Sequence, residues 1–425
     1  MNSTNLSNIE KSKNKYQNIK SRKILRIIFN HLSKRKYLDI IKYNKMIQKR
    51  INININDYKL SSEIYSSIEI EVIPANNKYG QFINFIDKEK EIYYHIYFNY
   101  NKEEIKRNYL KENEEIKIIK IIIDYPVKSF MKLFYKCKCI ESIYFKKFIR
   151  TNIINMNSMF CWCVLLKELN LSYFNTNSVS DMNKLFFGCS SLKELNLSNF
   201  NTNNVTGMDN IFYGCSSLKE LDLSNFNTNN VKIMRSMFDG CLSLKEINIS
   251  EFNTNNVTDM SYMFNKCSSL EKLNLSNFNN NSVTNMNSIF SGCSSLKELN
   301  LSNFGTNNVI DMGNMFNRCS SLNELNLSSF NTKKVTNMES MFSGCSSLKE
   351  LNISNFNVTY AINMRYMFFK CLSLKVLTFP NLNLDYFNNV YCMFSNCSVQ
   401  LIKKILAQNK NLYKKEIFQL IFINN

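Results

Sequence analysis

The chain has 425 residues, with 53 Lys and Arg against 34 Asp and Glu, and its formal net charge is +19. The basic excess lies in residues 1–150 and 401–425, whereas residues 151–400 hold equal numbers of basic and acidic side chains. We therefore do not expect the central part to bind nucleic acid, because phosphates attract basic surfaces. No apolar run reaches the roughly 20 residues that a transmembrane helix needs, which excludes that class of membrane protein.

The amino-terminal residues 1–20 are polar and basic and have no periodic apolar pattern. Such a composition is typical of a disordered segment, so we expect a basic arm. The arm also lacks the apolar core of a secretory signal. We therefore expect the protein to be cytoplasmic.

Residues 21–115 are expected to form a small, basic α+β domain. Apolar residues recur at steps of three and four from Ile24 to Leu32, which predicts an amphipathic helix at the start of 22–50. Alternating apolar and polar residues in 67–73 predict a strand. The basic side chains of 22–50 allow three interpretations: a solvated helix face, an adaptor-binding helix pair, or attraction to nucleic acid or an anionic membrane.

Residues 116–400 contain a repeat with a period of 26 residues. A phenylalanine precedes each repeated cysteine by three residues. A fixed period in this range is typical of a solenoid, in which neighbouring units share one core. We expect a strand at 116–123 to cap the first coil and a helical cap in 401–425. The repeated cysteines are Cys137, Cys163, Cys189, Cys215, Cys241, Cys267, Cys293, Cys319, Cys345, Cys371 and Cys397.

One copy of the repeat, residues 205–226, predicts the content of each coil. Apolar residues between Val205 and Cys215 follow steps of three, one and three, which predicts a short helix. Leu221 and Leu223 alternate with polar residues, which predicts a short strand. The expected fold class is therefore α/β: a solenoid with one short strand and one short helix per coil, preceded by the small α+β domain.

The sequence contains no motif that indicates catalysis. It has no nucleophile–base pair, glycine-rich phosphate loop or H-E-x-x-H segment, so we do not expect an enzyme. The pairs Cys137/Cys139 and Cys161/Cys163 have no histidine nearby, and the cysteine ladder already accounts for one member of each pair. We expect the ladder cysteines to be reduced and buried, and we expect neither a metal nor a cofactor.

The repeat resembles the BspA-like leucine-rich repeats over about two thirds of the chain. This resemblance implies a right-handed solenoid with one strand and one helix per coil. It also implies a function in adhesion at a cell surface, which is an alternative to the cytoplasmic location. One copy carries the resemblance through Met260, Met263, Phe264, Cys267, Leu270, Leu273, Leu275, Phe278 and Val283.

Residues 22–50 show a fainter similarity to an F-box, through I-L-R-I-I-F-N-H-L and K-Y-L-D-I-I-K-Y-N-K. The Leu-Pro opening that is usual in that family is absent. The resemblance implies a substrate receptor of a cullin-type ubiquitin ligase. The residues that would bind the ligase adaptor are Ile24, Ile28, Phe29 and Leu32.

The outward side chains of the short strands are the candidate binding face. Alternate residues of a strand point to opposite sides of the sheet, so the polar residues between the buried leucines should form parallel rows. We expect recognition of a protein partner through this face. The candidate residues are Glu194, Asn196, Glu220, Asp222, Glu246, Asn248, Asn274, Glu298, Asn300, Glu324, Asn326, Glu350 and Asn352.

Overall fold

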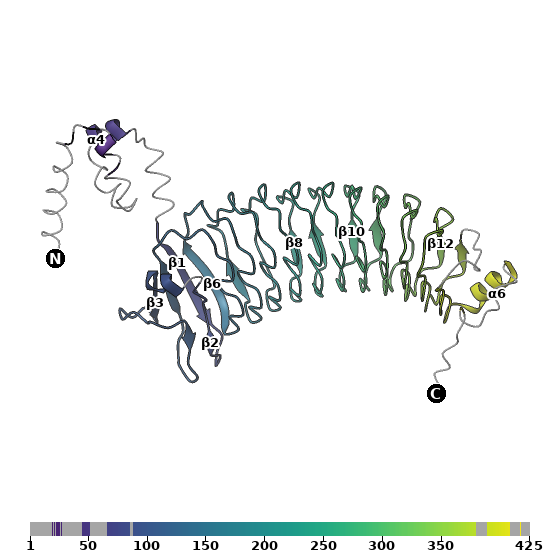
Figure 1. Cartoon of the computed structure of the whole chain (residues 1–425). Helices are drawn as coiled ribbons and strands as arrows, with labels where there is room; N and C mark the ends of the chain where they lie inside the picture. The colour runs from purple at the N-terminus through teal and green to yellow at the C-terminus, as the bar shows by residue number, and fades with distance from the viewer. Residues whose placement is uncertain are drawn as a thin grey trace.

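The protein is an elongated solenoid with a sheet at one end and a helix at the other (Figure 1). The computed structural model describes residues 66–85, 88–379 and 389–408, with 45–51 and the short pieces 19, 21, 23–25, 27 and 417. Helix α4 (Lys45–Ile51) precedes the sheet in sequence, and helix α6 (Val399–Gln408) follows the last described coil. The solenoid expected from the 26-residue period is confirmed.

A five-stranded sheet joins the amino-terminal part of the chain to the first coils. Its order is β3 (Tyr94–Phe98), β5 (Ile119–Ile123), β1 (Ile68–Pro74), β6 (Ile140–Lys147) and β7 (Glu168–Asn170). The first four strands pair antiparallel, and β6 pairs parallel with β7. Every second residue of β1, β3 and β5 is buried, as in a sheet with one face on the core.

The strand expected in 116–123 therefore forms as β5, but β1 is the strand that pairs with the first coil. The same region contains β2 (Gly80–Gln81), β4 (Tyr109–Leu110) and the 3-10 helix η1 (Lys88–Tyr93).

The strands of the later coils are three residues long, and neighbouring coils pair them in parallel without a register shift. Leu221 lies opposite Ile247 and Leu273 opposite Leu299, 26 residues apart in each case. Residues 194–196 and 324–326 occupy equivalent positions but are not assigned to strands. The strands are β8 (Glu220–Asp222), β9 (Glu246–Asn248), β10 (Lys272–Asn274), β11 (Glu298–Asn300), β12 (Glu350–Asn352) and β13 (Val376–Thr378).

The prediction of a short helix in each coil is wrong, because residues 209–214 and their equivalents form consecutive turns. Asn210, Phe212 and Gly214 donate their backbone N–H groups to carbonyls of the next coil, and Cys215 donates to Phe212. The φ angles of Asn210 (56°) and Gly214 (68°) are positive, which a right-handed helix does not accommodate. We call this part of each coil the turn segment.

The phenylalanine and cysteine ladders form the centre of the core. From Phe134 to Phe394, consecutive rings stack with centroids 5.3–5.9 Å apart and interplanar angles of 1–17°. From Cys163 to Cys397, each ladder thiol donates to the carbonyl oxygen of the phenylalanine 29 residues earlier, at 3.0–3.2 Å. All cysteines of the chain are buried free thiols.

Threonines in the loops form a second, polar ladder. Thr202 donates its hydroxyl to the carbonyl oxygen of Asn227 at 2.9 Å and accepts the Asn227 backbone N–H at 2.7 Å. Asn280 occupies the equivalent position one coil after Thr254, and its amide nitrogen and oxygen are both buried without a hydrogen-bond partner. The Thr254 hydroxyl is also buried and without a partner, so the ladder is interrupted there.

Each end of the solenoid has its own cap. Asn84 donates its backbone N–H to the Leu133 carbonyl at 2.7 Å and its side-chain amide to the Tyr135 carbonyl at 2.9 Å. It therefore satisfies groups of the first coil that face away from the second coil. At the other end, Phe394 donates its N–H to Ile417 at 3.2 Å, and Leu401 of α6 is buried.

Candidate functional site

The exposed side chains of the short strands form a continuous polar surface, which we call the strand face. Its first row, the Glu row, contains Glu194, Glu220, Glu246, Glu298, Glu324 and Glu350. Its second row, the Asn row, contains Asn196, Asp222, Asn248, Asn274, Asn300, Asn326 and Asn352. All these side chains are exposed, because the leucines or isoleucines between them and after them turn toward the core.

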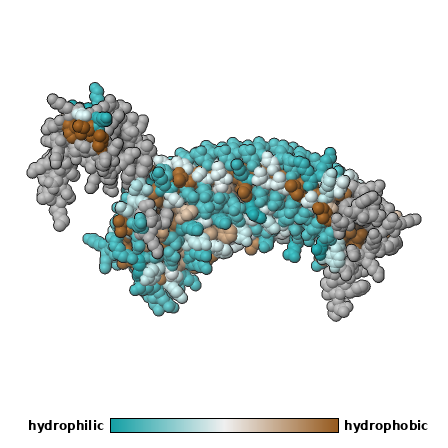
Figure 2. All heavy atoms as spheres, viewed as in Figure 1, coloured by the Kyte–Doolittle hydropathy of each residue, from teal (hydrophilic) through white to brown (hydrophobic). Residues whose placement is uncertain are grey.

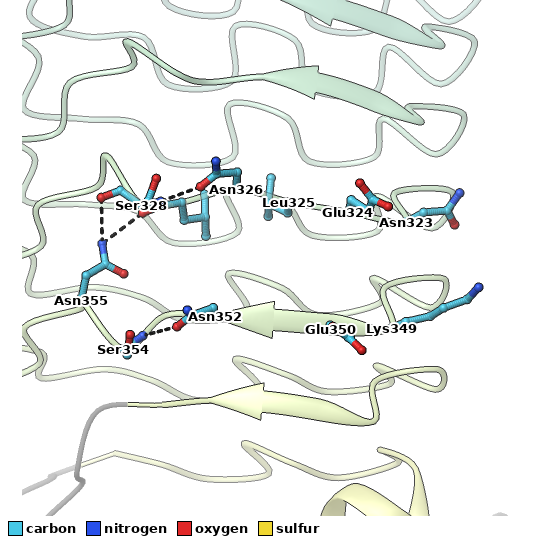
Figure 3. Close-up of a pocket in the computed structure, with 11 residues that line it drawn as sticks. Asn323, Glu324, Leu325, Asn326, Ser328, Lys349, Glu350, Asn352, Ser354 and Asn355 are labelled. Carbon is cyan, nitrogen blue, oxygen red and sulfur yellow. Dashed lines mark hydrogen bonds between the residues drawn. The ribbon is translucent and has the colours of Figure 1, made fainter.

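The Asn row also stabilises the backbone where each strand ends. The Asn196 side-chain oxygen accepts the backbone N–H of Ser198 at 3.0 Å, and the Asp222 carboxylate accepts that of Ser224 at the same distance. The bond from Ser224 keeps the pKa of Asp222 below its ordinary value. Asn326 and Asn352 repeat this arrangement with Ser328 and Ser354 (Figure 3). Side chains of the Asn row therefore already form hydrogen bonds that stabilise the backbone.

A row of lysines runs beside the Glu row and includes Lys193, Lys219, Lys245, Lys297 and Lys349. One coil exchanges the two charges and carries Glu271 in the Lys row and Lys272 in the Glu row. The exchange brings opposite charges together between neighbouring coils: Lys272 lies 2.8 Å from Glu298, and Lys297 lies 3.0 Å from Glu271. The bond from Lys297 keeps the pKa of Glu271 low, and Glu298 raises the pKa of Lys272. Positive and negative rows therefore run in parallel along the strand face.

The strand face is hollowed in several places. One open hollow of about 740 Å³ lies between residues 323–328 and 349–355 (Figure 3). A second, of about 480 Å³, lies between residues 193–198 and 219–225. Glu, Asn, Ser and Lys side chains form most of both linings, unlike the mainly apolar linings of small-molecule pockets. Figure 2 shows a mostly hydrophilic surface along the repeats with isolated apolar residues.

The strand face begins earlier than the sequence analysis predicted. Tyr144 of β6 donates its hydroxyl to Glu168 of β7, and this bond raises the pKa of Tyr144. With Asn170, these side chains line a further open hollow. Glu168 and Asn170 lie 26 residues before Glu194 and Asn196, so extending the period backwards would have found them. Tyr144 has no such signal, because the first coil departs from the repeat.

The four residues expected to bind a ligase adaptor are described only in part. Ile24 has 52% of its surface exposed, whereas Ile28, Phe29 and Leu32 lie outside the described residues. Within the described ranges, His, Cys, Asp and Glu side chains form no group of three that could hold a metal ion. The helices of the described part are too short or too polar to traverse a membrane.

Three overlapping segments, residues 128–246, 216–304 and 292–405, match the family model described as "Mycoplasma protein of unknown function, DUF285". Together these segments span the coils, and they include the whole strand face from Tyr144 onward. Among curated proteins, none matches this chain.

Two solved structures share a weak similarity with the chain. A leucine-rich cell surface protein of Faecalibacterium prausnitzii is 14% identical, with 62% of this chain and 86% of that chain covered, at a TM-score of 0.26. A leucine-rich repeat protein of T. pallidum is 20% identical, with 47% and 73% covered, also at a TM-score of 0.26. Superpositions this poor give no grounds for transferring a property to this chain.

Proposed function

We propose that this chain, a member of the DUF285 family, is a scaffold that binds a protein partner along its strand face. The observation that carries the proposal is the continuous pair of charged rows on neighbouring coils. Glu220 lies opposite Glu246, and Lys272 opposite Glu298, one coil apart in parallel register. A partner lying along the solenoid would meet the same pair of charges at most coils, and the exchanged pair at the coil of Glu271 and Lys272.

The shape of the strand face favours a macromolecular partner. The hollows between residues 193–225 and 323–355 are open, and most of the residues that line them are polar or charged. A small ligand would therefore remain in contact with water. Several coils together present an area of the kind that protein interfaces bury. Paired rows of opposite charge favour a partner whose own surface carries both signs, since electrostatic complementarity selects the partner and its orientation.

The proposal is tested by capturing partners from source cells with the full-length chain and with two charge-reversal variants. The first variant, Glu220→Lys with Glu246→Lys, reverses two neighbouring charges of the strand face. The matched control, Glu103→Lys with Glu112→Lys, makes the same change at exposed positions of the amino-terminal region. Like charges placed opposite each other cost several kcal/mol, so the first variant should bind a recovered partner at least about tenfold more weakly, and the control should not.

Equal recovery of every partner by the three proteins would contradict recognition through the strand face. The same capture separates the other functions predicted from the sequence. An adaptor of a cullin-type ligase that binds all three proteins would support the F-box-like interpretation of residues 22–50. Digestion of the protein by protease added outside intact cells would support the surface adhesin.

A further inference from the structure

We propose that aromatic and lysine side chains on the turn segments of the first four coils dock on an anionic phospholipid surface. The patch consists of Tyr135, Trp162, Phe187 and Tyr213 with Lys132, Lys136 and Lys184. It belongs to a different part of each coil from the strand face. It therefore goes beyond the protein-binding function proposed above.

Three of the four aromatic side chains, Trp162, Phe187 and Tyr213, form one contiguous surface. The Trp162 and Phe187 ring centroids lie 5.3 Å apart at 62°, and those of Phe187 and Tyr213 lie 4.3 Å apart at 9°. Trp162 has 40% of its surface exposed, and the other three side chains are half-buried. A Cβ on Gly188 would lie 2.7 Å from the Trp162 ring, so glycine at this position lets the indole lie against the next coil.

Three lysines surround this aromatic surface. The ammonium groups of Lys132 and Lys136 lie 5.6 and 5.1 Å from the Tyr135 ring centroid. Burial raises the pKa of the neighbouring Cys161 thiol to about 11. The positive charges of Lys184, Lys136 and Lys132 oppose that rise, so all three act on the same part of the surface. In the described part of the chain, none of the three lysines forms an ion pair with a carboxylate.

The patch ends where the fifth coil begins. The row that contains Tyr135, Phe187 and Tyr213 continues with Asp239 and Asn265. Asp209 of the fourth coil interacts electrostatically with Lys184 and also with Arg235 of the next coil, and both positive charges favour a lower pKa of its carboxyl group. Aromatic rings and lysines without a carboxylate partner therefore occur together over the first four coils. The combination recurs near the other end of the solenoid, where Lys370 lies 5.3 Å from the Phe369 ring centroid.

The packing of the rings favours a lipid surface over single-stranded nucleic acid. Bases bind to proteins by stacking on open aromatic faces. Here Phe187 and Tyr213 stack on each other, and Lys132 and Lys136 lie over Tyr135. Trp and Tyr side chains settle at the boundary between headgroups and acyl chains, and neighbouring lysines gain free energy from anionic headgroups. The patch supplies both features on one face.

Trp162 makes the test direct, because it is the only tryptophan of the chain. The full-length protein is titrated with vesicles of phosphatidylcholine alone and of phosphatidylcholine with phosphatidylserine, while tryptophan emission is recorded. Vesicles with phosphatidylserine should shift the emission to shorter wavelength, and brominated lipids should quench it. Phosphatidylcholine alone should have little effect. Added salt should reverse the binding, because it screens charge.

A triple variant tests the lysines. Each lysine near an anionic membrane contributes about 1 kcal/mol, so Lys132→Gln, Lys136→Gln and Lys184→Gln together should weaken vesicle binding about 100-fold. The matched control changes three exposed lysines of the amino-terminal region in the same way and should bind like the wild type. These lysines are Lys102, Lys111 and Lys117.

Three results would overturn the proposal. The first is the absence of any change in Trp162 emission with either vesicle. The second is equal weakening by the two triple variants, which would indicate attraction by net charge alone. The third is quenching of Trp162 by oligouridine without a response to vesicles, which would indicate a nucleic-acid site.

Discussion

Replacing one ring of the phenylalanine ladder tests how strongly neighbouring coils depend on each other. Phe264 is completely buried and stacks on Phe238 at 5.4 Å and on Phe290 at 5.9 Å. Phe264→Ala would leave a cavity that two adjacent coils share. Such a change in a core costs about 3–5 kcal/mol, and each lost ring contact contributes about 0.5–1.5 kcal/mol beyond its buried area. We expect the free energy of unfolding to fall by about 4 kcal/mol.

The assay is urea unfolding followed by circular dichroism, with two controls. Phe264→Leu keeps most of the volume but loses the stacking, so it should fall between the wild type and the alanine variant. Glu298→Ala changes an exposed side chain of the strand face and should leave the unfolding midpoint close to the wild type. Equal effects of Phe264→Ala and Glu298→Ala would refute the assignment of inward and outward positions. A loss of only about 1 kcal/mol would show that the coils adapt to the cavity.

Two further predictions concern polar atoms of the core. Asn280→Thr removes two buried amide atoms that lack partners and restores the threonine ladder. Because such atoms cost about 1–3 kcal/mol each, the urea midpoint should rise, whereas the exposed control Asn281→Thr should leave it unchanged; a lower midpoint for Asn280→Thr would contradict the ladder. The second prediction concerns pH, because burial raises the pKa of Cys293 and of Cys345 to about 12. The unfolded thiols ionise near pH 8.5 and the folded ones do not, so stability should be constant at neutral pH and fall from about pH 9 toward pH 12. Thiolate absorbance that rises while the chain is still folded would disprove this.

The repeat pattern predicted the core well, because the period alone determines which residues turn inward. Phe264 and Cys267 recur in every coil, and their equivalents from the first coil to the last are buried. The same pattern misled the prediction of local structure. Met208, Ile211 and Cys215 have helical spacing, yet consecutive turns place them on one side equally well. The recurring Gly214 was a usable signal, since glycine adopts the positive φ of 68° that a helix excludes.

The order of the amino-terminal sheet could not be obtained from the sequence. Alternation predicted the strand at β1, and β-branched residues predicted the strand at β5. Their neighbours depend on contacts between distant segments: β5 lies between β3 and β1, although β1 comes first in the chain. The capping of the first coil by Asn84 could not be predicted either, for the same reason. Its partners, Leu133 and Tyr135, are about 50 residues away.

The sequence predicted that the candidate site is exposed. It did not predict that the side chains of the Asn row bind the backbone of their own coil. A sequence pattern places Asn196 and Glu194 on the same face without showing that Ser198 already engages the Asn196 side chain. This bond leaves the Glu row and its neighbouring lysines as the side chains with the greatest freedom to meet a partner. Binding by the strand face remains a proposal for both rows.

The arrangement of charge on the strand face limits which partners can lie along it. A partner that carries only one sign of charge would be attracted by one row and repelled by the other. Long polyanions and polycations would therefore gain little electrostatic free energy from binding. A partner with two rows of opposite sign would gain at both, in one orientation only, because turning it around would place like charges opposite each other. The exchanged pair Glu271 and Lys272 interrupts this pattern at one coil and ties its charges to Lys297 and Glu298. A partner that follows the rows must therefore exchange its own positive and negative charges at that coil, or it loses the ion pairs there. The exchanged pair thus determines which coil each part of the partner contacts.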